Sequence, residues 1–116
     1  MANEISIVVS MTVRKGGAEA QRAETISVDV AGDAFSHEIQ EIGTSNEALV
    51  EGAALGTPGY VFIKNLDSTN FVEVGLTSSY TIKLKAGEVA LFRADGAIFA
   101  KADTSSCDVE YWIIED

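Results

Sequence analysis

Oxygen-bearing side chains cluster in the stretch NLDSTN, residues 65–70, where a hard cation such as calcium could bind. Asn65, Asp67 and Asn70 would each supply an oxygen ligand of the kind that calcium takes. The stretch lacks the alternating acidic pattern of a known calcium loop, and Asp, Ser and Asn also hydrogen-bond the backbone in turns. The sequence therefore favours a plain turn over a metal site, and no cofactor is predicted.

Aromatic residues lie on both sides of this turn and would stack on sugar rings if they were exposed. Tyr60 and Phe62 precede the turn and Phe71 follows it. Carbohydrate-binding β-sandwich modules use such rings, but alternating aromatic residues more commonly belong to a core. Glycan binding is therefore kept as an alternative function.

The residues that serve most enzymes are scarce and isolated. His37 is the only histidine, and it has no Ser, Cys or metal-ligand partner in motif spacing. Cys107 is the only cysteine, and its place in an apolar alternation predicts a small buried hydrophobic residue. Carboxylates are plentiful, but glycoside hydrolysis needs two of them at a defined separation across a cleft. The protein is predicted not to be an enzyme.

The charge balance is strongly acidic. Eighteen Asp and Glu against eight Lys and Arg give a net charge of −10, which repels nucleic acid and anionic membrane surfaces. Residues 32–58 carry five acidic side chains and no Lys or Arg, which predicts a solvated face. The first residues lack the features of a signal peptide, and no apolar run approaches the length of a membrane helix. Neither nucleic acid nor a membrane is expected as a partner.

Period-two alternation predicts strands in the first part of the chain. The first strand has one apolar face and one polar face, so it is expected to be half-buried. Val8 is the one apolar residue on the polar face. The apolar face consists of Ile5, Ile7, Val9, Met11 and Val13. Two adjacent glycines then lead to a second strand over 25–30. Residues 33–42 have apolar spacing that also fits a short helix, but barely two turns are marginal, so a strand is favoured.

From residue 59 onward the strand pattern is continuous. YVFIKN and FVEVG flank LDSTN and are predicted to form a hairpin, and SYTIKL with EVALFRA a second one. Roughly eight to ten strands with Gly turns and no helical crossover indicate an all-β fold. We expect an antiparallel β-sandwich over residues 1–116 as one domain, with the jelly roll as one form that it could take.

The last strand carries the candidate interface. Cys107, Val109, Tyr111 and Ile113 would face the core and Asp108 and Glu110 the solvent, so Trp112 and Ile114 emerge on the charged side. Soluble monomers seldom expose such a patch, and Trp is favoured at interface centres. We predict that Trp112 and Ile114, with Val8, meet another subunit. The alternative is that another strand or loop of the same chain covers Trp112 and Ile114.

Several motifs in the second part of the chain resemble a group of small β-rich structural proteins of tailed bacteriophages. The resemblance covers residues 43–116 and rests on four stretches of the sequence: GTPGYVFIKNLDSTNFVEVG, IKLKAGE, AKA and YWIIED. It implies a virion component made in the host cytoplasm, whose partners are the major capsid protein or other virion proteins, and which forms a homo-oligomer. Capsid decoration or cementing is the expected role, with a tail or neck position as the alternative.

Overall fold

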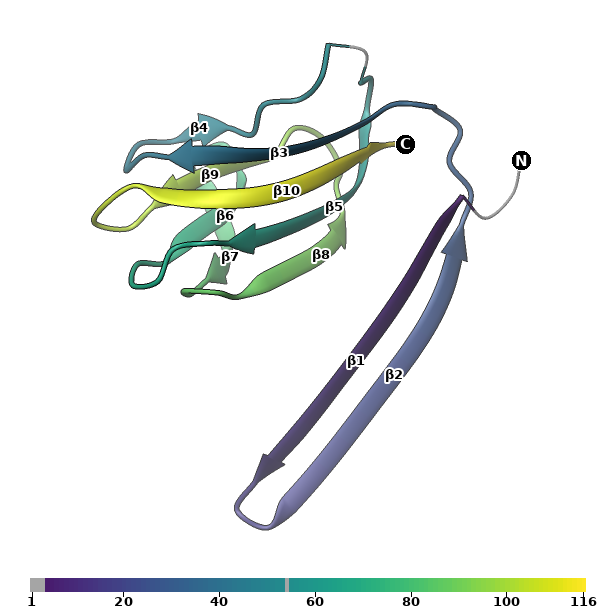
Figure 1. Ribbon diagram of the computed structural model, residues 1–116, viewed down its shortest axis with the longest axis vertical. Coiled ribbons are helices and arrows are strands. Elements are labelled where there is room, and N and C mark those ends of the chain that lie inside the picture. Colours follow the sequence, from purple (N-terminus) through teal and green to yellow (C-terminus); the bar gives the residue numbers. More distant parts are fainter. Residues whose placement is uncertain (1–3, 54) are drawn as a thin grey trace. The chain divides into compact units, whose positions relative to one another are not determined.

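The chain folds into strands, turns and loops, with no helix in the part that the structure describes. The computed structural model describes residues 4–53 and 55–116 (Figure 1). It divides the chain into two units, Met1–Ala31 and Gly32–Asp116. The first unit contains β1 (Ile5–Lys15) and β2 (Ala18–Val28). The second contains β3 (Phe35–Ile42), β4 (Glu47–Ala48), β5 (Pro58–Asn65), β6 (Val72–Leu76), β7 (Ser79–Leu84), β8 (Val89–Arg93), β9 (Phe99–Ala102) and β10 (Cys107–Glu115).

The second unit is an antiparallel sandwich of two four-stranded sheets, which confirms the predicted fold class. The strand orders are β3-β10-β5-β8 and β4-β9-β6-β7. Strands pair in a nested series, β3 with β10, β4 with β9, β5 with β8 and β6 with β7. The chain therefore runs as one long antiparallel ribbon that is folded across two sheets and closed by the β6–β7 hairpin. This is the topology of a jelly roll.

The core lies between the two sheets and is built from the inward positions of each strand. Because side chains alternate along a strand, β5 and β10 each bury every second residue. Valine and isoleucine fill most of these positions, as expected for a pleated, closely packed surface. The largest fully buried apolar side chains are Tyr111, Ile42, Ile63, Ile113, Val61, Val72, Val74 and Val109.

The two predicted hairpins of the second unit are wrong in their pairing. β5 pairs with β8 and β10, whereas β6 pairs with β7 and β9, so the stretch Gly56–Gly75 crosses from one sheet to the other. β7 and β8 likewise belong to different sheets. The predicted turn at LDSTN is confirmed, since Asp67 Oδ2 accepts hydrogen bonds from the amides of Thr69 and Asn70 at 2.9 and 2.6 Å. Such a turn can join two neighbouring strands of one sheet or two strands that belong to different sheets.

Asn65 fixes this crossover from inside the sandwich. Its side chain is fully buried and donates to the carbonyl groups of Asn70 and Leu84 at 2.9 and 3.1 Å. Its Oδ1 accepts from the amide of Asp67 at 2.9 Å. One amide group therefore satisfies three backbone groups around the crossover, as buried polar groups require.

The ambiguous segment over residues 33–42 contains a strand, as favoured from the sequence. β3 pairs along its whole length with β10, from Ile42 opposite Cys107 to Phe35 opposite Ile114. It is the edge strand of its sheet. Tertiary pairing thus decides a segment whose local spacing fits either structure.

The first unit departs from the predicted single sandwich. β1 and β2 form a two-stranded sheet of their own, closed by Gly16 and Gly17 at φ 60° and 83°. Positive φ at both central residues makes the tight turn that suits a hairpin. Val9, Met11 and Val13, which were expected to be half-buried in the sandwich, are exposed. Ile7 of the same face is buried and Ile5 is partly buried. A two-stranded sheet has no second layer in its own unit, so the residues nearer the turn stay exposed.

We predict that Asn65→Ala lowers the free energy of unfolding of the sandwich by about 3 kcal/mol, because three backbone groups lose their buried partner. Urea unfolding followed by Trp112 fluorescence measures this. Asn46→Ala is the matched control, since Asn46 is exposed and bonds to the β6–β7 turn through Thr77 and Ser78. Its loss should stay below about 1 kcal/mol. Equal losses in the two variants would show that Asn65 does not fix the crossover.

Tyr111 should make stability fall at high pH. Burial, with a smaller effect of the Glu38 charge, raises the pKa of Tyr111 from 10.0 to about 12. A raised folded-state pKa means that the neutral phenol contributes stability that is complete below pH 10.0 and is lost as the pH rises towards about 12. An alkaline titration of phenolate absorbance should show a late step near pH 12, absent in Tyr111→Phe. A late step that survives in Tyr111→Phe contradicts the assignment.

Candidate docking face

The outward side of the β3-β10-β5-β8 sheet is the candidate functional site, and we call it the docking face. It consists of the residues that alternate with the core positions of these four strands. Its members are Phe35, His37, Ile39 and Glu41 of β3, Asp108, Glu110, Trp112 and Ile114 of β10, Tyr60, Phe62 and Lys64 of β5, and Val89, Leu91 and Arg93 of β8. Strand pairing brings these residues together from four separate parts of the chain.

Two rows cross the docking face from one edge strand to the other. In the first, Trp112 lies opposite both His37 and Phe62, and Phe62 lies opposite Leu91. This row is apolar from its centre to the β8 edge. In cross-strand pairs the side chains are close enough to contact each other directly, so the row forms a continuous surface.

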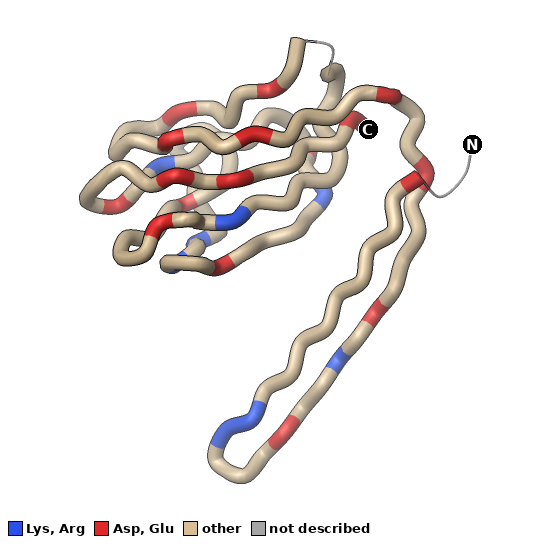
Figure 2. The backbone as a smooth tube through the Cα atoms, in the orientation of Figure 1, with Lys and Arg blue, Asp and Glu red and all other residues tan. Residues whose placement is uncertain are grey.

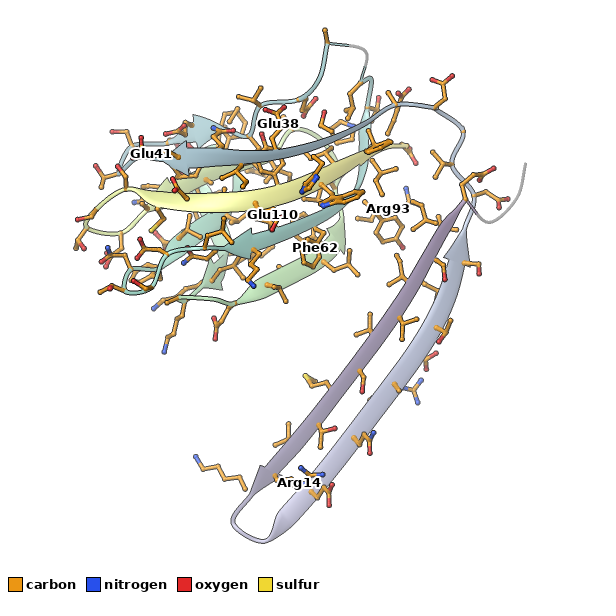
Figure 3. The ribbon with its side chains drawn as sticks, in the orientation of Figure 1. Arg14, Glu38, Glu41, Phe62, Arg93 and Glu110 are labelled. Atoms are coloured by element: carbon orange, nitrogen blue, oxygen red, sulfur yellow. The ribbon has the colours of Figure 1, made fainter. Side chains whose placement is uncertain are left out.

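In the second row, Glu110 lies opposite both Ile39 and Lys64, and Lys64 lies opposite Val89. The two middle residues of this row, Glu110 and Lys64, are charged, and the two end residues, Ile39 and Val89, are apolar. Phe62 and Glu110 mark the two rows on neighbouring strands in Figure 3.

Large apolar side chains are exposed across the docking face. Phe35 and Ile39 keep 63% and 64% of their surface in water, and Trp112 keeps 40%. Val89 and Leu91 on the far edge strand are exposed as well. Single exposed apolar residues are ordinary, but five on three of the four strands of one sheet form a patch of the kind that marks interaction sites.

Aromatic stacking holds Trp112 in place. Its ring stacks on Phe35 with centroids 5.8 Å apart and an interplanar angle of 7°, and on His37 with centroids 4.5 Å apart. His37 is fixed in turn by Glu110, whose Oε2 lies 2.7 Å from Nε2 of the imidazole. Stacked rings lose little further freedom on binding, which favours Trp112 as a rigid anchor.

The outward side of the other sheet differs, because among the residues described only Leu76 of its strands is a large exposed apolar side chain. Lys101 and Glu73 form an ion pair with Nζ and Oε1 3.8 Å apart. Lys101 also lies over the ring of Tyr80, and Lys83 lies over the ring of Phe71. Cations over ring faces cover apolar surface with charge and leave less of it to attract a partner. The two sides of the sandwich are therefore unequal.

The residues of the predicted interface fall on two different units. Trp112 lies exposed on the docking face and Ile114 lies half-buried on the same face, so the structure brings these two together. Val8 is exposed on β1, which pairs with β2 in the hairpin unit. The reason is that β1 does not enter the sandwich, whatever its alternation suggests.

Phe35, Ile39, Val89 and Leu91 were not proposed as interface residues from the sequence. Their signal was present in the alternation: Phe35 and Ile39 share one parity in FSHEIQEI, and Val89 and Leu91 share one in EVALFRA. These residues occupy the positions of each predicted strand that alternate with its core positions, so the sequence pattern marks them as facing outward. Only the strand order shows that the two pairs lie on the same face.

Other candidate residues have structural roles. Cys107 is buried at the start of β10, as predicted, and burial raises the pKa of its thiol. The oxygens of Asn65 and Asp67 bind backbone amides. Among the residues described, no group of three or more His, Cys, Asp and Glu side chains is placed to hold a metal ion. The same part of the chain contains no helix long and apolar enough to cross a membrane.

The sugar-stacking candidates have partners as well. Arg93 lies over the ring of Tyr60 at 4.8 Å, and Lys83 lies over the ring of Phe71 at 4.1 Å. A sugar ring needs a free aromatic face, and these two rings already have a cation on one side. No family model, curated protein or solved structure matches this chain.

Proposed function

We propose that the protein is a structural component of a tailed-bacteriophage virion, which docks through its docking face onto another virion protein. Capsid decoration or cementing is the preferred role. The observation that carries the docking proposal is the exposure of Phe35, Ile39, Val89, Leu91 and Trp112 on one side of the sandwich. The virion assignment comes from the resemblance of the motifs in residues 43–116.

The composition of the docking face supports binding to a protein. A Trp at the centre, large apolar residues beside it and charged groups around them match the core and rim of protein interfaces. Trp112 is held by Phe35 and His37 before any partner arrives, which lowers the entropy cost of binding. This geometry favours a partner surface with an apolar pocket or ridge.

Charge restricts the partner further. Residues 32–116 carry fourteen acidic and five basic side chains, a net charge of −9. An acidic partner would be repelled, so we expect a surface with Lys or Arg around an apolar centre. Many copies on one lattice would add avidity to a contact of modest affinity. A tail or neck position would use the same face against a different partner.

The first test is to look for the protein in purified virions of the phage that encodes it. Quantitative mass spectrometry should find many copies per particle. Cryo-EM should place the sandwich on the capsid with the docking face buried against a neighbour. Density in the tail or neck would overturn the decoration role while keeping the structural one. Absence from the particle would overturn the virion proposal.

We predict that Leu91→Lys weakens binding to particles assembled without the protein by about tenfold or more, because it puts a charge at the β8 end of the apolar row. Co-sedimentation with such particles measures the affinity. Leu76→Lys is the matched control, because Leu76 is also exposed but lies at the end of β6 in the other sheet. Equal binding by the two variants would show that the docking face is not used.

A further inference from the structure

The hairpin of the first unit has a strand edge that lacks the usual protection against pairing. β1 pairs with β2 along one edge only, within a two-stranded sheet. From Ile5 to Val13 it has nine residues with no charge, no Pro and no Gly. Proteins protect exposed edges with Lys, Pro, bulges or short strands, and this stretch has none of these. β2, by contrast, carries Glu19, Arg22 and Glu24 along its length.

The two faces of β1 differ in polarity. Val9, Met11 and Val13 lie on one face with Ile26 of β2, and all four are exposed. On β2 this face also carries Glu24 opposite Val9 and Arg22 opposite Met11, and these two charges form an ion pair. The opposite face of β1 consists of Ser6, Val8, Ser10, Thr12 and Arg14. An exposed apolar face beside an unprotected edge requires a partner strand that matches its alternation.

We propose that β1 pairs antiparallel with β1 of a second copy of this chain, about a two-fold axis at Ser10. The product is one four-stranded sheet in the order β2-β1-β1-β2. In this register Val9 lies opposite Met11 of the second copy, and Ile7 lies opposite Val13. These apolar pairs share one face of the sheet, and cross-strand pairs of this kind contribute to its stability.

The polar face is matched by the same register. Val8 lies opposite Thr12 of the second copy, and Ser10 lies opposite Ser10. A shift by one residue would set apolar side chains of one copy against the polar face of the other, so the alternation excludes such shifts. Among the registers that keep the faces matched, the one centred on Ser10 is the one that the crosslinking below tests. A symmetric contact of this kind closes after two copies and does not grow into a filament.

The distribution of charge along the chain favours pairing between two copies through their hairpins. Residues 1–31 carry three basic and four acidic side chains, so the hairpin is nearly neutral while the remainder of the chain has a net charge of −9. Repulsion between copies is therefore weakest at the hairpins. Figure 2 shows Lys and Arg in blue close to the turn of the hairpin, with an acidic residue beside them. Arg14 and Lys15 end β1 here, Glu19 of β2 pairs with Arg14 at 2.9 Å, and Glu4 directly precedes the other end of β1. Antiparallel pairing sets the basic end of each β1 beside the acidic end of the other.

Two single-cysteine variants of the full chain test the register. Ser10→Cys places two thiols directly opposite each other across the two-fold axis, within reach of a disulfide or a short bis-maleimide linker. Ser6→Cys is the matched control on the same face, but its two thiols would lie roughly 27 Å apart, at eight residue positions. We expect at least tenfold more crosslinked dimer from Ser10→Cys under mild oxidation. The unchanged chain, with Cys107 buried, gives the background.

Equal crosslinking of the two variants, or none from Ser10→Cys, would overturn the proposal. Sedimentation equilibrium of the full chain gives a second measurement that does not depend on cysteine chemistry. Val9→Lys should abolish the dimer while the thermal unfolding of the sandwich, followed by Trp112, stays unchanged. A Val9→Lys chain that still dimerises would place the contact elsewhere. Neither result bears on the docking face, so this proposal and the proposed function fail independently.

Discussion

The sandwich depends on the alternation along β10, the strand that is paired on both edges and buried on one face. Cys107, Val109, Tyr111 and Ile113 fill the core from this strand, while β3 and β5 pair with its two edges. The hydroxyl of Tyr111 donates to the carbonyl of Val50 at 2.6 Å, which connects β10 to the loop after β4. Because the period is two, fixing the inward set also fixes the outward set. Because Tyr111 and Ile113 point into the core, their neighbours Trp112 and Ile114 point to the outward face of the sheet.

The sequence predicts which residues face inward far better than which strands pair. Alternation is local, so β5 and β10 could be recognised with their buried sides from the residues alone. Pairing is a property of the whole sandwich, and the stretch LDSTN has the same turn chemistry whether it joins neighbours or crosses between sheets. The burial of Asn65, which distinguishes the two cases, depends on the carbonyl of Leu84, nineteen positions away. Local reasoning therefore gave a hairpin where the ribbon makes a crossover.

The same limit explains which parts of the docking face could be predicted. Trp112 was identifiable because it follows Asp108 and Glu110 on one parity of one strand, so a change from charged to apolar is visible within five residues. Phe35 and Leu91 lie on the two edge strands of the sheet, 56 positions apart in the chain. No pattern within either segment connects them. Val8 was grouped with Trp112 because every strand was assigned to one sandwich, whereas the hairpin is a unit of its own.

The two exposed surfaces differ in the chemistry by which they would bind. The docking face offers side chains over a sheet whose backbone is already paired, so its partner is selected by shape and by the position of Trp112. The edge of β1 offers backbone groups, and these pair with any strand whose alternation matches. Charge also differs between the two: residues 32–116 have a net charge of −9, which opposes contact between two sandwiches, whereas the hairpin is nearly neutral and lacks this repulsion. An acidic sandwich with an uncharged strand edge is thus suited to contact its own kind through one unit and a different protein through the other.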